Sequence, residues 1–322
     1  MKNPFQYAAD SATAASYTLT DLFEINDERR DALKRDRQKR GRPDSRQISL
    51  YKSIITSSIA ALEEFIESFI LVGFLEVSRL EDESFRSSEN LKNFLSRKIS
   101  REMQNPTPSR ISSMSQQYLG YKITDDWKAN LYSSQIRYKV VERKKGRNKV
   151  ELSSQSYTNV SLSGSQVVSV LDKFCKVRNS FAHQDSSVNV FSSKEIQKFE
   201  NIIHTREISD EQKNMLEVIS CSSAFFLKEK IEPGEDPLLS WTVHERHCIN
   251  SLYLFLNLVT SSIDGVMNYL SEEYGVEYDP VVFEIEKGRW AKHLEKNEVF
   301  RSENISLKLV DYTPKSRIRG ND

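Results

Sequence analysis

Between Tyr51 and Phe69, apolar residues recur at every third or fourth position, and this spacing is the strongest constraint on the fold. The repeating positions are Ile55, Ile59, Leu62, Phe65, Ile66 and Phe69. Residues spaced in this way share one face of an α-helix, whereas a half-buried strand would alternate at every second position. We therefore predict a long helix over about 46–78 that is buried along one face.

Similar patterns continue along the chain and indicate a mainly α protein. A second helix is expected around Leu91–Ile99 and should end before Pro106. Ser163, Gly164 and Ser165 form a plausible start for a helix over about 165–184. Further helices are predicted over about 193–207, 210–231 and 243–273. The chain shows no internal repeat.

One stretch changes from helical spacing to alternation. Residues 135–142 and 149–152 flank the basic segment 143–148, which is typical of a β-hairpin with a charged tip. Residues 157–161 could add a third strand. The expected fold class is thus a helical bundle with a small β-hairpin insertion at about 131–162 and extra helices after it.

Charge and turn residues suggest boundaries between regions. Residues 29–42 hold eight basic and two acidic side chains, and Gly41 and Pro43 interrupt the chain there. We predict a charged N-terminal arm over 1–44, a helical domain with the hairpin insertion over 45–210, and a C-terminal helical region over 211–322.

The overall composition favours a protein of the cytoplasm. Lys and Arg together number 46, as do Asp and Glu, so attraction to a nucleic acid would have to come from local patches. Cys175, Cys221 and Cys248 are odd in number and far apart, which is not a disulfide framework. The start of the chain lacks the apolar core of a signal peptide, and no apolar run reaches the ~20 residues that span a bilayer. We expect a soluble, cytoplasmic protein without a membrane segment.

Arg178 is the most unusual residue of the predicted helix over 165–184. At about 100° per residue it falls within about 40° of Leu171 and Phe174, in the middle of the apolar stripe. An unpaired buried charge costs several kcal/mol. Arg178 therefore needs a carboxylate partner, a water-filled cleft or an anionic ligand such as phosphate.

His183 follows five residues later, which is about 140° further around an ideal helix. The side chains of Arg178 and His183 would then flank a groove rather than stack. Two such helices packed about a two-fold axis would bring both pairs to one cleft, so we expect a homodimer.

The motif Arg178-Asn179-Ser180-Phe181-Ala182-His183 resembles that of the HEPN superfamily of all-α proteins, whose ribonucleases carry Arg and His separated by four to six residues. The likeness is nearest to the RiboL-PSP-like and MAE_28990-like groups, and covers about 45–210. It implies metal-independent RNA cleavage without a cofactor at a dimer interface. Arg178 and His183 would be catalytic and Asn179 would assist. Because many relatives are toxins or anti-phage effectors, the resemblance also implies a toxin or defence role, restrained by a regulatory or antitoxin-like partner.

Other interpretations stay open. Arg178 could form a structural ion pair with Glu63, in a non-catalytic helical interaction protein. Glu63 itself could orient the catalytic groups or could be a solvated helix flank. His244 and His247 share a helical face and could hold a metal if Cys221 approached. No Gly-rich phosphate loop or serine-hydrolase elbow is present.

Two basic segments could bind RNA on either side of a cut site. One is 29–42. The other is the hairpin tip, with Arg143, Lys144, Lys145 and Arg147. Tyr132, Tyr138 and Tyr157 lie near the hairpin and could stack on bases. The alternatives are a solvated helix and a charged strand edge that prevents aggregation, or a protein that binds single-stranded RNA without cutting it.

Overall fold

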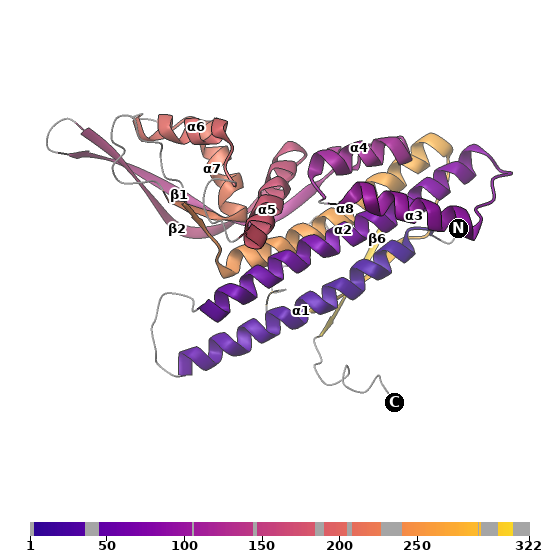
Figure 1. Cartoon of the computed structure of the whole chain (residues 1–322), viewed down its shortest axis with the longest axis horizontal. Coiled ribbons are helices and arrows are strands. Elements are labelled where there is room, and N and C mark those ends of the chain that lie inside the picture. Colours follow the sequence, from indigo (N-terminus) through magenta and orange to yellow (C-terminus); the bar gives the residue numbers. More distant parts are fainter. Residues whose placement is uncertain are drawn as a thin grey trace.

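A computed structural model describes nine parts of the chain. They are residues 3–35, 45–104, 106–143, 147–183, 190–204, 208–226, 240–288, 290 and 302–311. Over these ranges the protein is mainly helical, as predicted, with three two-stranded sheets. Figure 1 shows that the longest helices run along the long axis of the molecule.

The helices and strands follow one another in this order: α1 (Gln6–Arg35), α2 (Ser45–Glu81), α3 (Glu89–Met103), α4 (Pro108–Leu119), the short 3₁₀ helix η1 (Ile123–Asp125), β1 (Lys128–Arg143), β2 (Arg147–Ser163), α5 (Ser165–His183), α6 (Ser193–His204), α7 (Asp210–Ser222), β3 (Ala224–Phe226), β4 (Ser240–Thr242), α8 (Glu245–Tyr274), β5 (Val281–Lys287) and β6 (Ile305–Asp311). The pairs β1–β2 and β3–β4 are antiparallel, and β5–β6 is parallel.

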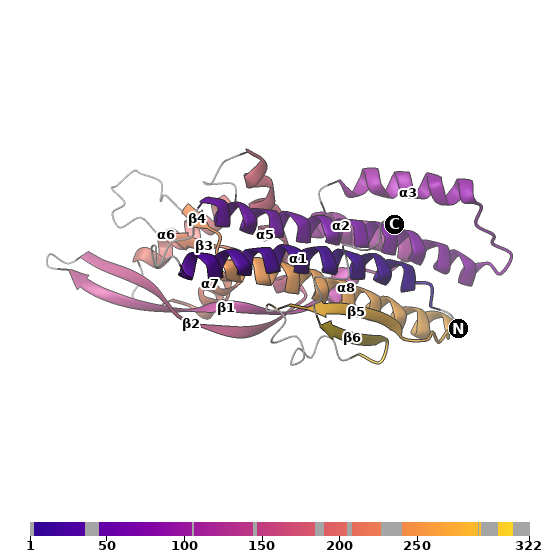
Figure 2. The ribbon, with the colours of Figure 1, turned by 90° about the horizontal axis from the view of Figure 1, so that it is seen from below.

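The helices α1, α2 and α8 lie side by side and form the frame of the molecule (Figures 1 and 2). The buried face of α2 contains the residues of the predicted stripe, from Ile55 and Ile59 to Phe65 and Phe69. The long-helix prediction is therefore confirmed, with bounds three residues longer at the C-terminal end. Burial of this stripe stabilises α2, because each large apolar side chain contributes about 1.5–3 kcal/mol when removed from water.

The centre of the bundle is α8. Every residue from Asn250 to Ile263 is buried, so this helix is enclosed around its whole circumference. Some of its polar side chains bond within the helix, as Thr260 does when its hydroxyl donates to the carbonyl of Leu256 (2.8 Å), and others reach neighbouring elements, as Ser251 does to Ser58 of α2 (3.1 Å). Among the described helices, none combines the length and the low charge needed to cross a membrane.

The predicted hairpin is present and longer than expected. β1 pairs with β2 from Lys128↔Ser163 to Arg143↔Arg147, with one shift in register between Ser134 and Ile136. The third strand expected at 157–161 was wrong, since these residues continue β2. No turn residue separates them from the preceding part of the strand, so the pairing simply goes on.

Asn250 of α8 fixes the base of this hairpin. Its amide nitrogen donates to the carbonyls of Tyr132 and Cys221 (both 2.7 Å), and its amide oxygen accepts from the backbone N–H of Tyr132 (2.8 Å). Asn250 is fully buried. One side chain thus joins α8, β1 and the end of α7.

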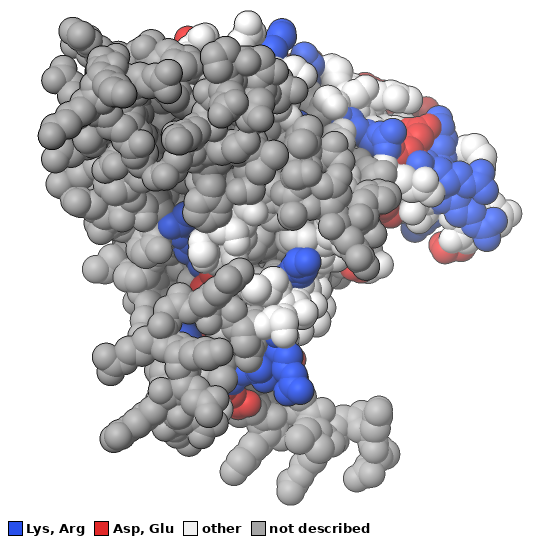
Figure 3. Space-filling view, turned by 60° about the vertical axis from the view of Figure 1, so that its left-hand side comes forward, with Lys and Arg blue, Asp and Glu red and all other residues white. Residues whose placement is uncertain are grey.

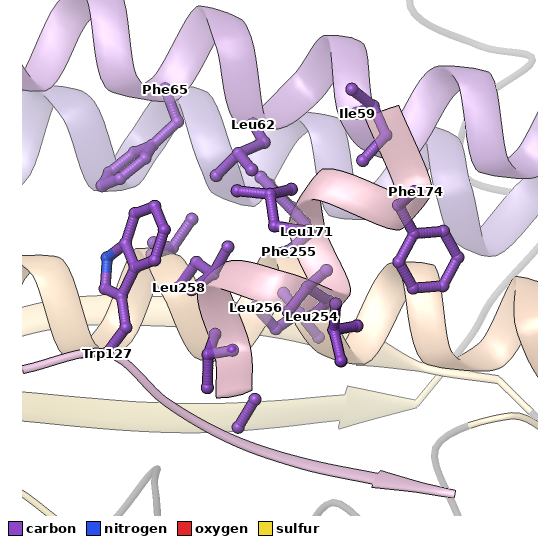
Figure 4. Packing of buried hydrophobic residues seen from close by; sticks show 14 of the residues in the cluster. Ile59, Leu62, Phe65, Trp127, Leu171, Phe174, Leu254, Phe255, Leu256 and Leu258 are labelled. Carbon is purple, nitrogen blue, oxygen red and sulfur yellow. The ribbon is translucent and has the colours of Figure 1, made fainter. Parts of the chain in front are cut away.

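The helix that carries the motif, α5, begins directly after the hairpin. Gly164 links the two with φ of 48°, a left-handed conformation that glycine adopts without steric cost. Figure 4 shows Leu171 and Phe174 of α5 directed toward the bundle, near Ile59 and Leu62 of α2 and the leucines of α8. This apolar face fixes the rotation of α5 and hence the position of Arg178.

Several elements differ from the expectations. The sequence predicts no helix at 108–119, because Pro106 and Pro108 favour a helix end; instead Pro108 lies in the first turn of α4, where its missing N–H costs nothing. The helix expected over 210–231 ends at Ser222, where the chain becomes extended. The parallel pair β5–β6 was not predicted. Neither was α1, whose buried face is mostly small and polar, with residues such as Ala8, Ser16 and Thr20, and so has a weak hydrophobic signal.

Candidate functional site

Arg178 leaves the apolar side of α5 and reaches the flank of α2. Its side chain is 15% exposed, and its Nη1 lies 3.6 Å from Oε2 of Glu63, whose side chain is 24% exposed. This distance is longer than a hydrogen bond, so the attraction is mainly Coulombic. Arg178 thus has the carboxylate partner that a charge on an apolar helix face was expected to need. Both charged groups also keep contact with solvent.

Asn179 supports the guanidinium from the other side. Its Oδ1 accepts a hydrogen bond from Nε of Arg178 at 3.2 Å. Asn179 itself is exposed. The contact holds the Nε edge of the planar guanidinium, and Nη1 is the nitrogen that lies near Glu63.

Two further carboxylates lie near Glu63 on α2. Burial raises the pKa of Glu67, the Ser100 hydroxyl of α3 acts in the opposite direction, and the negative charges of Glu63 and Glu64 raise it further. Glu64 accepts a hydrogen bond from Ser11 of α1 (3.3 Å). Glu67 was not predicted as part of the site, although its spacing of four residues from Glu63 places it on the same helical face.

Cys175 lies one turn before Arg178 and is not a reactive thiol. Burial raises its pKa to about 12 although the nearby Arg178 lowers it, so it is protonated at neutral pH. Its Sγ donates to the carbonyl of Pro106 at 3.5 Å. Cys175 therefore ties α5 to the segment between α3 and α4.

The structure leaves the other half of the motif untested. His183 is the last residue of α5, and its side chain lies outside the described residues. Lys144 and Lys145 lie outside them as well. Arg143 and Arg147 face each other across the hairpin end, and their side chains are likewise not described.

The basic segment 29–42 is described only in part. Arg30 is engaged inside the molecule: it pairs with Asp27 (2.9 Å) and with Glu245 at the start of α8. Its charge is therefore compensated by two carboxylates. Residues 36–44 lie outside the described ranges.

Tyr132 does not offer the exposed ring that base stacking would need. It is half-buried and its ring packs against that of Tyr253, with centroids 5.7 Å apart. Burial raises the pKa of Tyr132. The side chains of Tyr138 and Tyr157 lie outside the described residues.

The metal interpretation of His244 and His247 finds no support. His247 is fully buried, and its Nδ1 accepts the backbone N–H of His244 at 2.9 Å, which caps α8. Burial and the adjacent Arg246 hold its pKa well below the usual value. Within the described ranges, no three His, Cys, Asp or Glu side chains are arranged to hold an ion.

A bundle of this kind, with Arg-Asn before a terminal His on an amphipathic helix, defines a HEPN-type helical protein. A family model described as RiboL-PSP-HEPN matches residues 20–220, which is more than half of the chain and includes Glu63, Arg178 and His183. The chain belongs to the RiboL-PSP-HEPN family. No curated protein and no solved structure gives a significant match. Membership of a family of HEPN-type ribonucleases indicates RNA as the substrate class.

Proposed function

We propose that this protein is a metal-independent endoribonuclease of HEPN type that acts as a homodimer. One observation carries the proposal: the side chain of Arg178, in the family-matched region, is largely buried on α5 but keeps 15% of its surface exposed to solvent. Such a cation can receive a phosphodiester without the full cost of burying an unpaired charge. A guanidinium also matches the paired oxygens of a phosphate.

In the proposed reaction the 2′-hydroxyl of RNA attacks the adjacent phosphorus. The bond from phosphorus to the 2′-oxygen forms, and the bond to the 5′-oxygen of the next nucleotide breaks, which yields a 2′,3′-cyclic phosphate and a 5′-hydroxyl. His183 moves a proton from the 2′-oxygen or to the leaving 5′-oxygen, a role to which imidazole is suited in general because it changes charge near neutral pH, and which is typically worth about 10²–10⁴-fold. Arg178 stabilises the additional negative charge on the phosphate oxygens. DNA lacks the attacking hydroxyl and is not cut.

Asn179 is a positioning residue in this scheme, and Glu63 is the carboxylate that holds Arg178 until RNA binds. Their contacts restrain the guanidinium of Arg178 from two sides in the free protein. A bound phosphate would take up the terminal nitrogens and weaken the long contact to Glu63. The acidic cluster on α2 would then border the bound linkage.

The test uses purified full-length protein with mixed tRNA and mRNA in the presence of a chelator. The wild type should cleave, while Arg178→Ala and His183→Ala should each lose at least about a hundredfold in rate. Lys176→Ala is the matched control, because Lys176 lies on the same helix and pairs only with Asp172 (2.7 Å) within the described structure. Products should carry cyclic phosphate ends. Equal activity of wild type and His183→Ala would refute the proposal.

The ion pair of Arg178 with Glu63 also favours a second candidate, a non-catalytic interaction or regulatory protein. In that case Arg178→Ala would lower stability without affecting any cleavage. Wild-type protein that leaves every RNA intact, with an Arg178→Ala variant of clearly lower melting temperature, would support this second candidate.

We further propose that the ribonuclease acts in the cytoplasm as a toxin or anti-phage effector restrained by a partner. The support is the family likeness alone. Inducible expression in bacteria should arrest growth for the wild type and not for His183→Ala. Unchanged growth with wild-type protein that cleaves RNA in vitro would contradict a toxic role.

A further inference from the structure

An open groove lies between α3 and α4, apart from Arg178. Its volume is about 500 Å³. The residues that matter for its chemistry are Arg101, Glu102, Ser109, Arg110, Ser113 and Gln117. Nearly all of this lining is polar, which differs from the mostly apolar pockets that hold small molecules.

The groove carries a net positive charge that is exposed to solvent. Arg101 is exposed and forms no ion pair or side-chain hydrogen bond within the described parts of the chain. Arg110 donates to the backbone carbonyl of Gln104 and pairs with no carboxylate in the same ranges. Glu102 is the one acidic group of the lining, and its carboxylate accepts the hydroxyl of Tyr118 at 3.1 Å. Two guanidinium groups therefore face solvent against one engaged carboxylate.

The groove adjoins the Arg178 site through two contacts. Cys175 of α5 bonds to the carbonyl of Pro106, immediately before the residues of α4 that line the groove. Ser100, next to Arg101, lies close enough to Glu67 to lower its pKa. Figure 2 shows α3 and one end of α5 on the same side of α2. The groove and the helix that carries Arg178 thus share one side of α2.

Figure 3 shows another face of the molecule. Described Lys and Arg side chains gather toward its right-hand side, with a few Asp and Glu side chains among them. In sequence, α3 itself carries Lys92, Arg97, Lys98 and Arg101 against Glu89 and Glu102. The local excess of positive charge would attract a polyanion even though the whole chain is neutral.

We propose that the groove between α3 and α4 binds the phosphodiester backbone of single-stranded RNA on one side of the cleaved linkage. Arg101 and Arg110 contact successive phosphates, and the hydroxyls of Ser109 and Ser113 add neutral donors. This inference rests on the proposed ribonuclease function. It names an RNA subsite that determines affinity rather than the chemical step.

The test compares the Arg101→Ala/Arg110→Ala variant with the wild type on two substrates. For an RNA oligonucleotide long enough to extend from the Arg178 site into the groove, KM should rise about tenfold or more while kcat is unchanged. For a dinucleotide, which is too short to reach the groove, both constants should stay the same. Because about 0.7 counterions are released per phosphate contact on single strands, the slope of log KM against log salt should flatten by about 1.4.

Two further variants control for charge and folding. Arg86→Ala/Lys122→Ala removes two exposed cations that do not line the groove and should leave KM within about twofold. Arg101→Lys/Arg110→Lys keeps the charge and should recover most of the affinity. An unchanged KM for long RNA with the alanine pair would overturn the inference, and so would an equal loss on the dinucleotide.

Binding of an oligonucleotide with a 2′-deoxy linkage separates this inference from the proposed function. If the wild type binds this probe without cleaving ordinary RNA, and binding still depends on Arg101 and Arg110, the groove is supported and the ribonuclease proposal fails. If the wild type cleaves RNA but binding does not depend on either arginine, the ribonuclease proposal stands and the proposed RNA subsite in the groove is refuted.

Discussion

Arg178 and Glu63 form a pair that is neither fully buried nor freely solvated. Their 3.6 Å separation and partial exposure mean that solvent screens the attraction, so the pair contributes little to stability. A pair of this kind can be opened by a competing anion at small cost. That property would suit the proposed role, in which the guanidinium exchanges a carboxylate for a phosphate.

We therefore expect Glu63→Gln to favour RNA binding. Removing the negative charge beside the phosphate should lower KM a few-fold and leave kcat within about threefold, while the free energy of unfolding changes by under about 1 kcal/mol. Steady-state cleavage and urea unfolding measure these effects. A collapse of kcat would instead identify Glu63 as an essential orienting group.

Lys173 and Glu195 form a contrasting pair, in which the cation is buried and hydrogen-bonded to its carboxylate. Lys173 is 3% exposed, and its Nζ donates to Oε2 of Glu195 (2.6 Å) and to the carbonyl of Val190 (2.7 Å). Glu195→Ala would leave the ammonium buried without its counter-charge and should lower the free energy of unfolding by about 3 kcal/mol. Lys198→Ala, which opens an exposed pair with Glu211, should change it by less than about 1 kcal/mol. Similar losses in both variants would contradict this account.

The same pair makes stability depend on pH. Burial alone would raise the pKa of Glu195, but hydrogen bonds from Lys173 and Ser192 outweigh it and lower the pKa. A carboxyl whose pKa is depressed in the folded state stabilises the fold above its unfolded value of about 4.5 and loses that contribution as the pH falls through the folded pKa. We would measure the free energy of unfolding between about pH 6 and 3, which is the range that this pKa shift affects. It should fall more steeply for the wild type than for Glu195→Gln.

At the scale of elements, Asn250 joins α8 to the hairpin base. Replacing it by Ala leaves two carbonyls and one N–H without their partner in the interior, which should cost about 3 kcal/mol. We also expect faster hydrogen exchange of the Tyr132 amide. Asn268→Ala, at an exposed side chain that accepts from Asn304, is the control. Unchanged exchange at Tyr132 would show that strand pairing alone holds the hairpin.

The strongly periodic elements could be predicted from the sequence. The stripe of α2 and the helix of the motif have large apolar residues at regular spacing, and alternation marks the hairpin. The alanine-rich α1 and the parallel β5–β6 pair have no such signal, because their burial depends on partners far away in the chain. Arg178 could be proposed as a candidate from the sequence because a charge amid apolar neighbours is conspicuous. Arg101 and Arg110 could not, since arginines on exposed helices are ordinary until the groove brings them together.

At the scale of the whole molecule, the predicted division at residues 44 and 210 stays a prediction. One continuous hydrophobic cluster includes Phe5, Phe65, Phe174 and Leu258. Residues from all three predicted regions therefore share one core. The family match over 20–220 likewise crosses both predicted boundaries.

The proposed homodimer also makes a prediction at this scale. If both motif helices must meet to form one cleft, cleavage per chain should fall as the protein is diluted below the dissociation constant of the dimer. Light scattering and initial rates over the same concentrations test this. Constant specific activity across a range in which the protein is shown to be monomeric would rule out a shared cleft.

The start of α1 is fastened to the strand that follows α8. Asn3 donates to the carbonyl of Asp279 (2.7 Å), and Gln6 both donates to and accepts from the backbone of Val282, so each contact spans 276 residues of sequence. Synthesis proceeds at roughly 5–20 residues per second. A growing chain must therefore hold its first helix unfastened for many seconds, until Val282 leaves the ribosome. If the chain is the ribonuclease that we propose, its bundle stays incomplete during that interval, so activity should arise only after synthesis of the C-terminal strand.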